Sequence, residues 1–148
     1  MKTRNVLFIC QHNSARSQMA EAFLSTTYDG SYTAYSAGIE PGPINPVVVK
    51  VMKEKGIDIS RNRSKSVKEF LDTDIDCVVT VCDQAKEMCP FFPGARVYIH
   101  KGFTDPSDIT GPPAFVEQQV RKIRDEICEW VRETFEPDHF KGEMEKIK

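Results

Sequence analysis

Residues 6–17 read VLFICQHNSARS, an apolar run that ends in a cysteine and continues through a polar loop to an arginine and a serine. Around this stretch, Asn5–Cys10 is rich in strand-forming residues, and Ala15–Tyr28 carries apolar side chains at helical spacing. A strand that passes through a short loop into a helix is the building unit of a parallel α/β sheet. The sequence therefore places Cys10 at the end of a strand and Arg16 near the start of a helix.

The rest of the chain continues the alternation of strands and helices. Further strands are predicted at 32–37, 76–82 and 96–100, and further helices at 47–55, with Asn45 as cap, and at 114–135. The continuous apolar strands fit a sheet that is buried on both sides. We expect a single-domain α/β three-layer sandwich over residues 1–136, with a four-stranded parallel sheet and helices on both faces. A polar tail, residues 137–148, is expected to fray.

The composition narrows the class of protein. The 148 residues suffice for one domain, and a net charge of −2 with both signs interspersed does not indicate a nucleic-acid surface. No apolar run approaches the ~20 residues of a membrane span, and no signal-peptide pattern opens the chain. We expect a cytoplasmic monomer that binds neither nucleic acid nor membrane. The odd number of cysteines, five, argues against an extracellular disulfide framework and favours catalytic or metal-binding thiols.

The loop after the first strand has the features of an anion-binding site that contains a nucleophile. A strand-to-helix loop directs N–H groups at one point, where the helix dipole also favours negative charge. The same field stabilises a Cys10 thiolate, and Arg16 offers a planar guanidinium that matches two oxygens of a tetrahedral anion. Ser17 can hydrogen-bond the thiolate, and Asn13 tolerates the left-handed backbone of a tight loop. The predicted oxyanion-binding residues are Gln11, His12, Asn13, Ser14, Ala15, Arg16 and Ser17.

A second interpretation of this loop makes Cys10 a buried structural residue and Arg16 a surface residue. A bare Cys-x5-Arg pattern occurs by chance, but its place between a strand and a helix favours function. The loop is not a nucleotide-binding P-loop, because the Gly-rich run with Lys-Ser/Thr is missing.

A general acid for the leaving oxygen is expected in GFTDP, residues 102–106. Loops that follow parallel strands gather at the carboxyl edge of the sheet, where Cys10 also lies. Asp105 beside a bound oxyanion would have a raised pKa and could hold a proton. Asp-Pro is also a common turn, and Asp108 is a competing candidate in the same loop.

Cys82 and Cys89 have a spacing that suggests a conformational change. Cys82 ends the strongest strand signal and should emerge beside Cys10 if the two strands are neighbours. If residues 82–89 are helical, the Cα atoms of the two cysteines lie ~10 Å apart, whereas a disulfide needs less than ~7 Å. A bond between them therefore requires this segment to unwind, which the Pro- and Gly-containing stretch 90–94 would ease.

Two other interpretations of this pair stay open. Cys82 and Cys89 could be inert packing residues, or they could bind zinc, although a matching second pair is missing. Cys77, inside a strand, and Cys128, among helix positions, are expected to be structural. No catalytic role is assigned to the histidines, which are His12, His100 and His139.

Taken together, five stretches of the chain resemble the thioredoxin-coupled arsenate reductases, which share their fold with the low-molecular-weight tyrosine phosphatases. The resemblance covers nearly the whole chain except the tail. The matching stretches are CQHNSARSQMAE at 10–21, YSAGIE at 35–40, GIDIS at 56–60, VVTVCDQAKEMCP at 78–90 and GFTDP at 102–106.

The resemblance implies a three-cysteine reduction of arsenate that serves arsenic detoxification. Cys10 attacks arsenate held by Arg16 and the loop amides, and Asp105 protonates the departing hydroxide. Cys82 then attacks the Cys10–arsenic adduct, which releases arsenite and leaves a Cys10–Cys82 disulfide. Cys89 attacks Cys82, and the unwound segment presents the Cys82–Cys89 disulfide to thioredoxin.

Two positions depart from the family pattern. The family loop often has a cysteine where Ala15 stands, and that residue takes no part in the relay. Some members bind potassium through Asn, Glu, Ser and Asp side chains; Asn13, Glu21 and Ser36 match, but Lys65 holds the fourth position. Because a lysine ammonium can replace the cation, we expect no metal or other cofactor, and stability and turnover that are insensitive to potassium.

The main alternative function is a low-molecular-weight protein tyrosine phosphatase, in which Cys10, Arg16 and Asp105 form a phosphocysteine that water hydrolyses. Phosphate and arsenate are tetrahedral oxyanions of similar charge, so residual phosphatase activity is expected. Against hydrolysis as the main role, the residues after Asp105 are not the usual substrate-binding aromatics, and Cys82 and Cys89 have no function in it. A third possibility, a non-enzymatic oxyanion-binding domain, is disfavoured because binding alone needs no nucleophile.

Overall fold

The computed structural model describes residues 3–145. Four parallel strands form one sheet in the order β2-β1-β3-β4. Their bounds are Arg4–Cys10 (β1), Tyr32–Gly38 (β2), Cys77–Thr80 (β3) and Val97–His100 (β4). The four-stranded parallel sheet expected from the sequence is confirmed.

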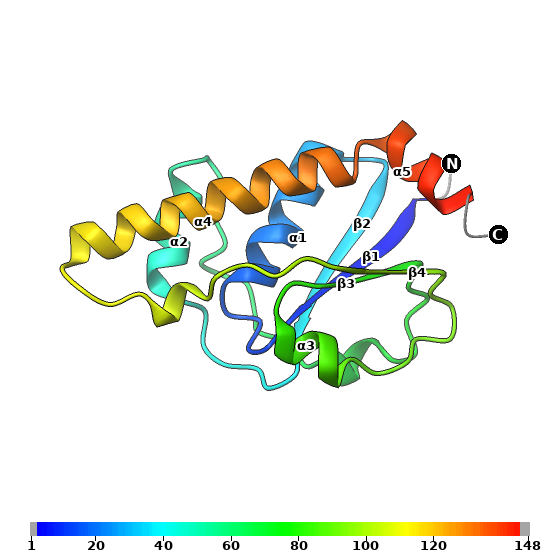
Figure 1. The fold of residues 1–148 in the computed structure, drawn as a ribbon, viewed down its shortest axis with the longest axis horizontal. Coiled ribbons are helices and arrows are strands. Elements are labelled where there is room, and N and C mark those ends of the chain that lie inside the picture. The colour runs from blue at the N-terminus through cyan, green and yellow to red at the C-terminus, as the bar shows by residue number, and fades with distance from the viewer. Residues whose placement is uncertain (1–2, 146–148) are drawn as a thin grey trace.

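Helices connect the strands and cover the sheet. The α-helices are α1 (Arg16–Thr27), α2 (Pro46–Lys53), α3 (Asp83–Met88), α4 (Pro113–Thr134) and α5 (Pro137–Glu145), and the 3-10 helices are η1 (Val67–Phe70) and η2 (Pro106–Asp108). In Figure 1 the long helix α4 and helix α1 lie on one side of the strands and α3 lies on the other. Within residues 3–145, no helix is both long enough and apolar enough to cross a membrane.

The sheet is buried on both faces, as its apolar strands require. Phe8 in β1 is fully buried, and its ring packs edge-on against Phe135, just beyond α4, with centroids 5.7 Å apart. Successive strand residues point to opposite faces. Tyr35 in β2 pairs with Leu7, so it points to the other face, where its ring lies 5.5 Å from that of Phe70 in η1. Helical elements therefore cover both faces, as expected.

The order of the strands brings two important segments to one edge of the sheet. From β1 the chain passes through α1 to β2 on one side, and later through β3 to β4 on the other. Such a reversal opens a crevice at the carboxyl ends of the two central strands, where ligands bind in open α/β sheets. Val81, just beyond β3, donates its N–H to the Ile9 carbonyl at 2.9 Å. Cys82 therefore emerges at the same edge as Cys10, as predicted.

The C-terminal segment is more ordered than the expected fraying tail. Residues 137–145 form α5, and Phe140 on this helix is buried. Its ring lies 5.5 Å from that of Tyr32 and 5.2 Å from that of Phe135. The packed structure thus continues past residue 136, because one aromatic side chain anchors an otherwise polar segment. Residues 146–148 of the expected tail lie outside the described residues.

Two residues of helix α4 have a burial that their side-chain types do not suggest. Phe115 is 46% exposed although it is aromatic, whereas Arg124 is buried although it is charged. The Arg124 guanidinium donates to the Val51 carbonyl and to Glu54 Oε1, both at 2.9 Å. A polar network thus joins α4 to α2, which hydrophobic spacing cannot reveal.

Candidate active site

Cys10 lies at the base of the loop that joins β1 to α1. Its side chain is buried, and its Sγ lies 2.8 Å from the Ser17 hydroxyl and 3.1 Å from the N–H of Asn13. The Asn13 N–H donates its hydrogen bond to the sulfur. The N-terminal end of α1 adds the field of the helix dipole. The predicted contact with Ser17 is confirmed, and the geometry suits Cys10 as a nucleophile.

A buried polar network fixes this loop in a left-handed turn. Asn13 is fully buried and has a φ of +52°, in the region predicted for it. Its Nδ2 donates to Ser17 Oγ at 2.8 Å, and Gln18 Nε2 donates to its Oδ1 and its carbonyl at 3.0 and 3.2 Å. Gln18, fully buried in α1, also donates to the Arg63 carbonyl. Several bonds thus orient the Asn13 N–H that faces Cys10.

Residues 39–45 support the loop from outside. Four of their N–H groups donate to loop carbonyls: Ile39 to Cys10, Glu40 to Gln11, Gly42 to His12 and Asn45 to Ser14. Because these carbonyls face outward, the amide side of the loop is left for an anion. The close approach depends on Gly38, where a Cβ atom would lie 2.7 Å from backbone atoms of His12 and Asn13. The site therefore requires glycine at position 38.

Arg16 and Asp105 meet at the mouth of the site. The buried guanidinium donates through Nη1 to the Phe103 carbonyl and through Nη2 to Asp105 Oδ2, both at 3.2 Å. Asp105 and Asp108 line one cavity of about 560 Å³ together with Arg16 and Cys82. It is Asp105 that pairs with Arg16, so the candidate general acid and the candidate oxyanion-binding cation are adjacent.

The pKa of Asp105 depends on which charged group lies beside its carboxyl group. Burial raises the pKa of Asp105, but hydrogen bonds from the Ser107 N–H and hydroxyl, together with Arg16 and His12, outweigh burial, so the net pKa is lowered. The predicted rise assumed an oxyanion beside the carboxyl group. Here the neighbour is the Arg16 cation, which favours the carboxylate. The lowered pKa therefore belongs to the pairing with Arg16, and the rise beside a bound oxyanion stays a prediction.

Cys82 and Cys89 lie at the two ends of α3. Cys82 is buried, and its Sγ caps the helix by accepting the Ala85 N–H at 3.4 Å. Burial raises the pKa of Cys82, although backbone N–H groups and the charge of Arg16 oppose the shift. Burial also raises the pKa of Cys89, whose thiol donates to the Pro90 carbonyl at 3.3 Å. The cysteines are free thiols, and a helix separates the pair as predicted.

Helix α3 is thinly packed along its length and held at its ends. Ala85 is its one buried residue, and Met88 is 63% exposed. At its start, His100 Nε2 lies 3.3 Å from Asp83 Oδ1. Beyond its end, Phe92 is buried and its N–H donates to the Tyr98 hydroxyl at 3.0 Å. A short helix with this little burial is expected to open at low cost.

Lys65 lies where the family resemblance suggests a cation. Its Nζ lies 3.5 Å from Ser36 Oγ and donates to the Arg63 carbonyl at 2.9 Å. Burial lowers the pKa of Lys65, and the nearby charge of Glu21 opposes this shift. Burial raises the pKa of Glu21, against Lys65 and a hydrogen bond from Ser36. An ammonium group among these side chains does not fit a potassium ion at the same point.

The two cysteines expected to be structural lie away from this cavity. Cys77 is fully buried in β3, where burial raises the pKa of its thiol. Cys128 is half-buried on α4, and burial raises its pKa as well. Neither thiol has the hydrogen-bond donors that surround Cys10.

Gln18, Gly38 and Phe103 are site residues without a signal in the sequence analysis. Gln18 is a polar residue in the middle of a helix, and Gly38 ends a strand; both could have been flagged as unusual for their positions. Phe103 acts through its backbone carbonyl, so its side-chain type gives no indication of that role.

The chain is similar in sequence to a known protein family and to curated proteins. Residues 5–143 match the family model described as low molecular weight phosphotyrosine protein phosphatase. An arsenate reductase from Halalkalibacterium halodurans is 40% identical over 127 residues, which cover 86% of this chain and 91% of that protein.

Two solved structures extend the likeness to three dimensions. An arsenate reductase in a phosphate-binding state has a TM-score of 0.73 at 28% identity and covers 99% of this chain and 100% of its own. A thioredoxin-dependent arsenate reductase from Corynebacterium glutamicum has a TM-score of 0.62 at 27% identity and covers 90% of this chain and 64% of its own. The chain therefore belongs to the low molecular weight phosphotyrosine protein phosphatase family, with arsenate reductases among its relatives.

Proposed function

We propose that this protein reduces arsenate to arsenite through a relay of Cys10, Cys82 and Cys89. The observation that carries the proposal is the second buried thiol, Cys82, which lines the same cavity as Arg16 and Asp105. A hydrolase needs one thiolate, whereas a reductase needs a second thiol to collect the electrons. The arsenate reductases among the relatives support this choice.

The first step is attack of the Cys10 thiolate on arsenic(V). The loop amides and Arg16 hold the oxyanion, an As–S bond forms, and an oxygen leaves as water after it takes a proton from Asp105. Asp105 is paired with Arg16 before the oxyanion arrives. When the oxyanion takes over the guanidinium, Asp105 loses its stabilising partner and faces negative charge, so its proton affinity rises. Asp105 then takes up a proton from solvent, and this is the proton that it donates to the leaving oxygen.

The second and third steps are thiol exchanges. The Cys82 thiolate attacks the Cys10 sulfur, an S–S bond forms, and the As–S bond breaks with its electron pair on arsenic, which leaves as arsenite. Arsenic gains two electrons, and two thiols become one disulfide. Cys89 then attacks the Cys82 sulfur, which releases the Cys10 thiolate and forms the Cys82–Cys89 disulfide. Because a disulfide spans less than ~7 Å between Cα atoms, α3 must unwind in this step.

We propose thioredoxin as the dithiol that reduces the Cys82–Cys89 disulfide. A structural neighbour is a thioredoxin-dependent arsenate reductase. In this chain, Met88 and Phe91 flank Cys89 with exposed fractions of 63% and 76%. Exposed large apolar side chains beside a thiol offer a surface for a protein reductant.

We further propose that the protein works in the cytoplasm as a monomer and without a bound metal. A reducing compartment keeps the relay thiols available. The Lys65 ammonium takes the place of a potassium ion near Glu21 and Ser36. Melting temperature and turnover should therefore be equal in potassium and sodium buffers of the same ionic strength. A clear rise in melting temperature with potassium would contradict this assignment.

Phosphatase activity is the second candidate function, favoured by the family match and by the Cys10, Arg16 and Asp105 arrangement. A hydrolytic cycle passes through a phosphocysteine that water cleaves, and it leaves every thiol unchanged. We propose it as a weak side activity, because Cys82 and Cys89 have no part in it.

A disulfide map separates these functions. After one arsenate turnover without reductant, peptide mass spectrometry of the wild-type protein should find the Cys82–Cys89 disulfide together with one equivalent of arsenite. The Cys89→Ser variant should stop at Cys10–Cys82, and Cys128→Ser should behave as the wild type. A protein that leaves all thiols free in arsenate, or a Cys89→Ser variant that turns over many times, would contradict the relay.

A further inference from the structure

We propose that Trp130 is a positioning residue for the oxyanion site: its ring holds Phe103, whose backbone carbonyl in turn holds Arg16. This inference rests on the proposed oxyanion chemistry and extends it to a residue on α4, behind the catalytic cavity. Phe103 lines that cavity and also a second one, of about 690 Å³, which Trp130 lines as well. Phe103 therefore separates the two.

The backbone of Phe103 joins the sheet to the guanidinium. Its N–H donates to the Val81 carbonyl at 3.1 Å, and its carbonyl accepts the bond from Arg16 Nη1 at 3.2 Å. A carbonyl at this point limits how far the guanidinium can swing. Small displacements of a group that grips an oxyanion cost affinity, because two-point recognition depends on a fixed orientation.

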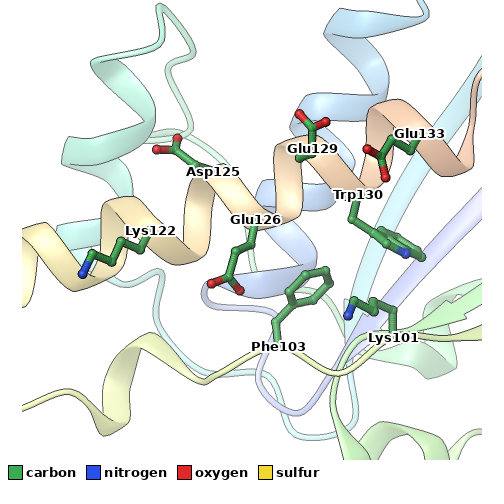
Figure 2. Close-up of a pocket in the computed structure, with 8 residues that line it drawn as sticks. All are labelled: Lys101, Phe103, Lys122, Asp125, Glu126, Glu129, Trp130 and Glu133. Carbon is green, nitrogen blue, oxygen red and sulfur yellow. The ribbon is translucent and has the colours of Figure 1, made fainter.

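The side chain of Phe103 is held from the other side. Its ring meets the Trp130 ring edge-to-face, with centroids 5.9 Å apart and an interplanar angle of 75°. Lys101 Nζ lies 5.6 Å from the centroid of the Phe103 ring. Figure 2 shows Phe103 pointing up from the segment after β4 and Trp130 pointing down from α4, so that the two rings converge. Such pairs have a preferred geometry, which restrains the phenyl ring.

Trp130 is itself anchored to the strand that bears the nucleophile. Its ring packs edge-to-face on Phe135 at 5.9 Å, and Phe135 packs on Phe8 in β1 at 5.7 Å. β1 ends at Cys10. Ring contacts therefore link β1, which bears Cys10, to the Phe103 carbonyl that holds Arg16. These contacts set the distance between Cys10 and Arg16.

The test measures oxyanion binding with inorganic phosphate, by isothermal titration calorimetry on the reduced full-length protein. Trp130→Ala should bind phosphate about three- to tenfold more weakly than the wild type, the range expected for losing the one ring pair that restrains Phe103. The KM for arsenate should rise by a similar factor, with a smaller change in kcat. Trp130→Phe should restore most of the affinity. Trp130→Leu, which keeps an apolar side chain but no ring, should resemble Trp130→Ala and guards against an unfolded alanine variant.

Phe140→Ala is the matched control. Phe140 packs on Phe135 and Tyr32 in the same aromatic cluster, so this variant should lose melting temperature and keep the phosphate affinity of the wild type. Wild-type affinity in both Trp130→Ala and Trp130→Leu, or an equal loss in Phe140→Ala, would overturn the positioning role and leave the relay intact. A wild-type protein that binds no phosphate would overturn the oxyanion function and this inference together.

Discussion

The Cys10 loop and helix α3 lie at the same edge of the sheet, but they are held in different ways. Four backbone hydrogen bonds from residues 39–45 support the loop, and buried Asn13 and Gln18 side chains fix its turn. Helix α3 buries one side chain, Ala85, and is secured mainly at its two ends. The loop is thus fixed along its length, whereas α3 is fixed mainly at its ends.

This difference matches the two kinds of chemistry proposed for the site. Gripping an oxyanion depends on donors that are already in place when the charge develops. Formation of the Cys82–Cys89 disulfide requires the two sulfur atoms to approach each other, because α3 separates Cys82 from Cys89 in the reduced protein. A rigid relay segment would stop after the first disulfide, and a mobile loop would bind the oxyanion weakly.

The largest effect is expected when the sulfur of Cys10 is removed. In Cys10→Ser, arsenite formation should fall below detection even in a single turnover, because a hydroxyl cannot form the disulfide that supplies two electrons. Cys89→Ser should still release one equivalent of arsenite per chain. Rapid quench with arsenite analysis measures both. Arsenite from Cys10→Ser would place the first attack at another thiol.

The second-largest effect is expected from a substitution at Gly38, which tests how rigidly the backbone of the Cys10 loop is held. In Gly38→Ala the added Cβ would lie 2.7 Å from the backbone of His12 and Asn13. We expect a loss of about 1–3 kcal/mol in the free energy of unfolding and a fall in kcat/KM of about tenfold or more, since the amides move. Urea unfolding and steady-state kinetics measure the two.

Gly142→Ala provides the control for that substitution. A Cβ at Gly142, in α5, meets no heavy atom within 4 Å. Alanine there should leave kcat/KM unchanged and stabilise the protein slightly, by about 0.5–1 kcal/mol. If Gly38→Ala proves as harmless as this control, the loop is not held by the close approach of β2.

The smallest effect is expected from a substitution that lowers the helical stability of α3. Glu87 is exposed within this helix, and glycine there should lower its helical stability by about 1 kcal/mol. If opening of α3 precedes attack by Cys89, conversion of Cys10–Cys82 to Cys82–Cys89 should speed up about fivefold. Gln118→Gly, at an exposed position of α4, carries the same intrinsic cost and should leave the conversion rate unchanged. A conversion rate in Glu87→Gly equal to that of the control would show that opening does not limit the exchange.

Sequence patterns predicted the framework of the site well because they depend on local rules. The apolar run before Cys10 and the capped helix after Asn45 are local signals, and parallel strands bring their ends together wherever such signals alternate. The prediction that a helical segment holds Cys82 and Cys89 too far apart for a disulfide followed from their separation along the chain. Cys10 and Cys82, on which these predictions depend, both lie at the carboxyl edge of the sheet.

What escaped prediction depends on partners far apart in the sequence. The lowered pKa of Asp105 arises from the balance of burial, Ser107 and Arg16, which no local pattern contains. Gly38 is required by a backbone that arrives from another segment. Phe140 and Arg124 are buried by contacts with residues about 70 or more positions away. Tertiary contacts of this kind become visible only once the chain is folded.

Hydrogen exchange measured before and after one arsenate turnover tests the central contrast most directly. In the reduced protein, amides of α3 should exchange faster than those of α1, and after turnover without reductant α3 should lose its remaining protection while α1 keeps its own. Peptide-level mass spectrometry of the same samples reports the disulfide state. Protection of α3 that persists in a protein carrying the Cys82–Cys89 disulfide, or that is lost equally in α1, would contradict the account.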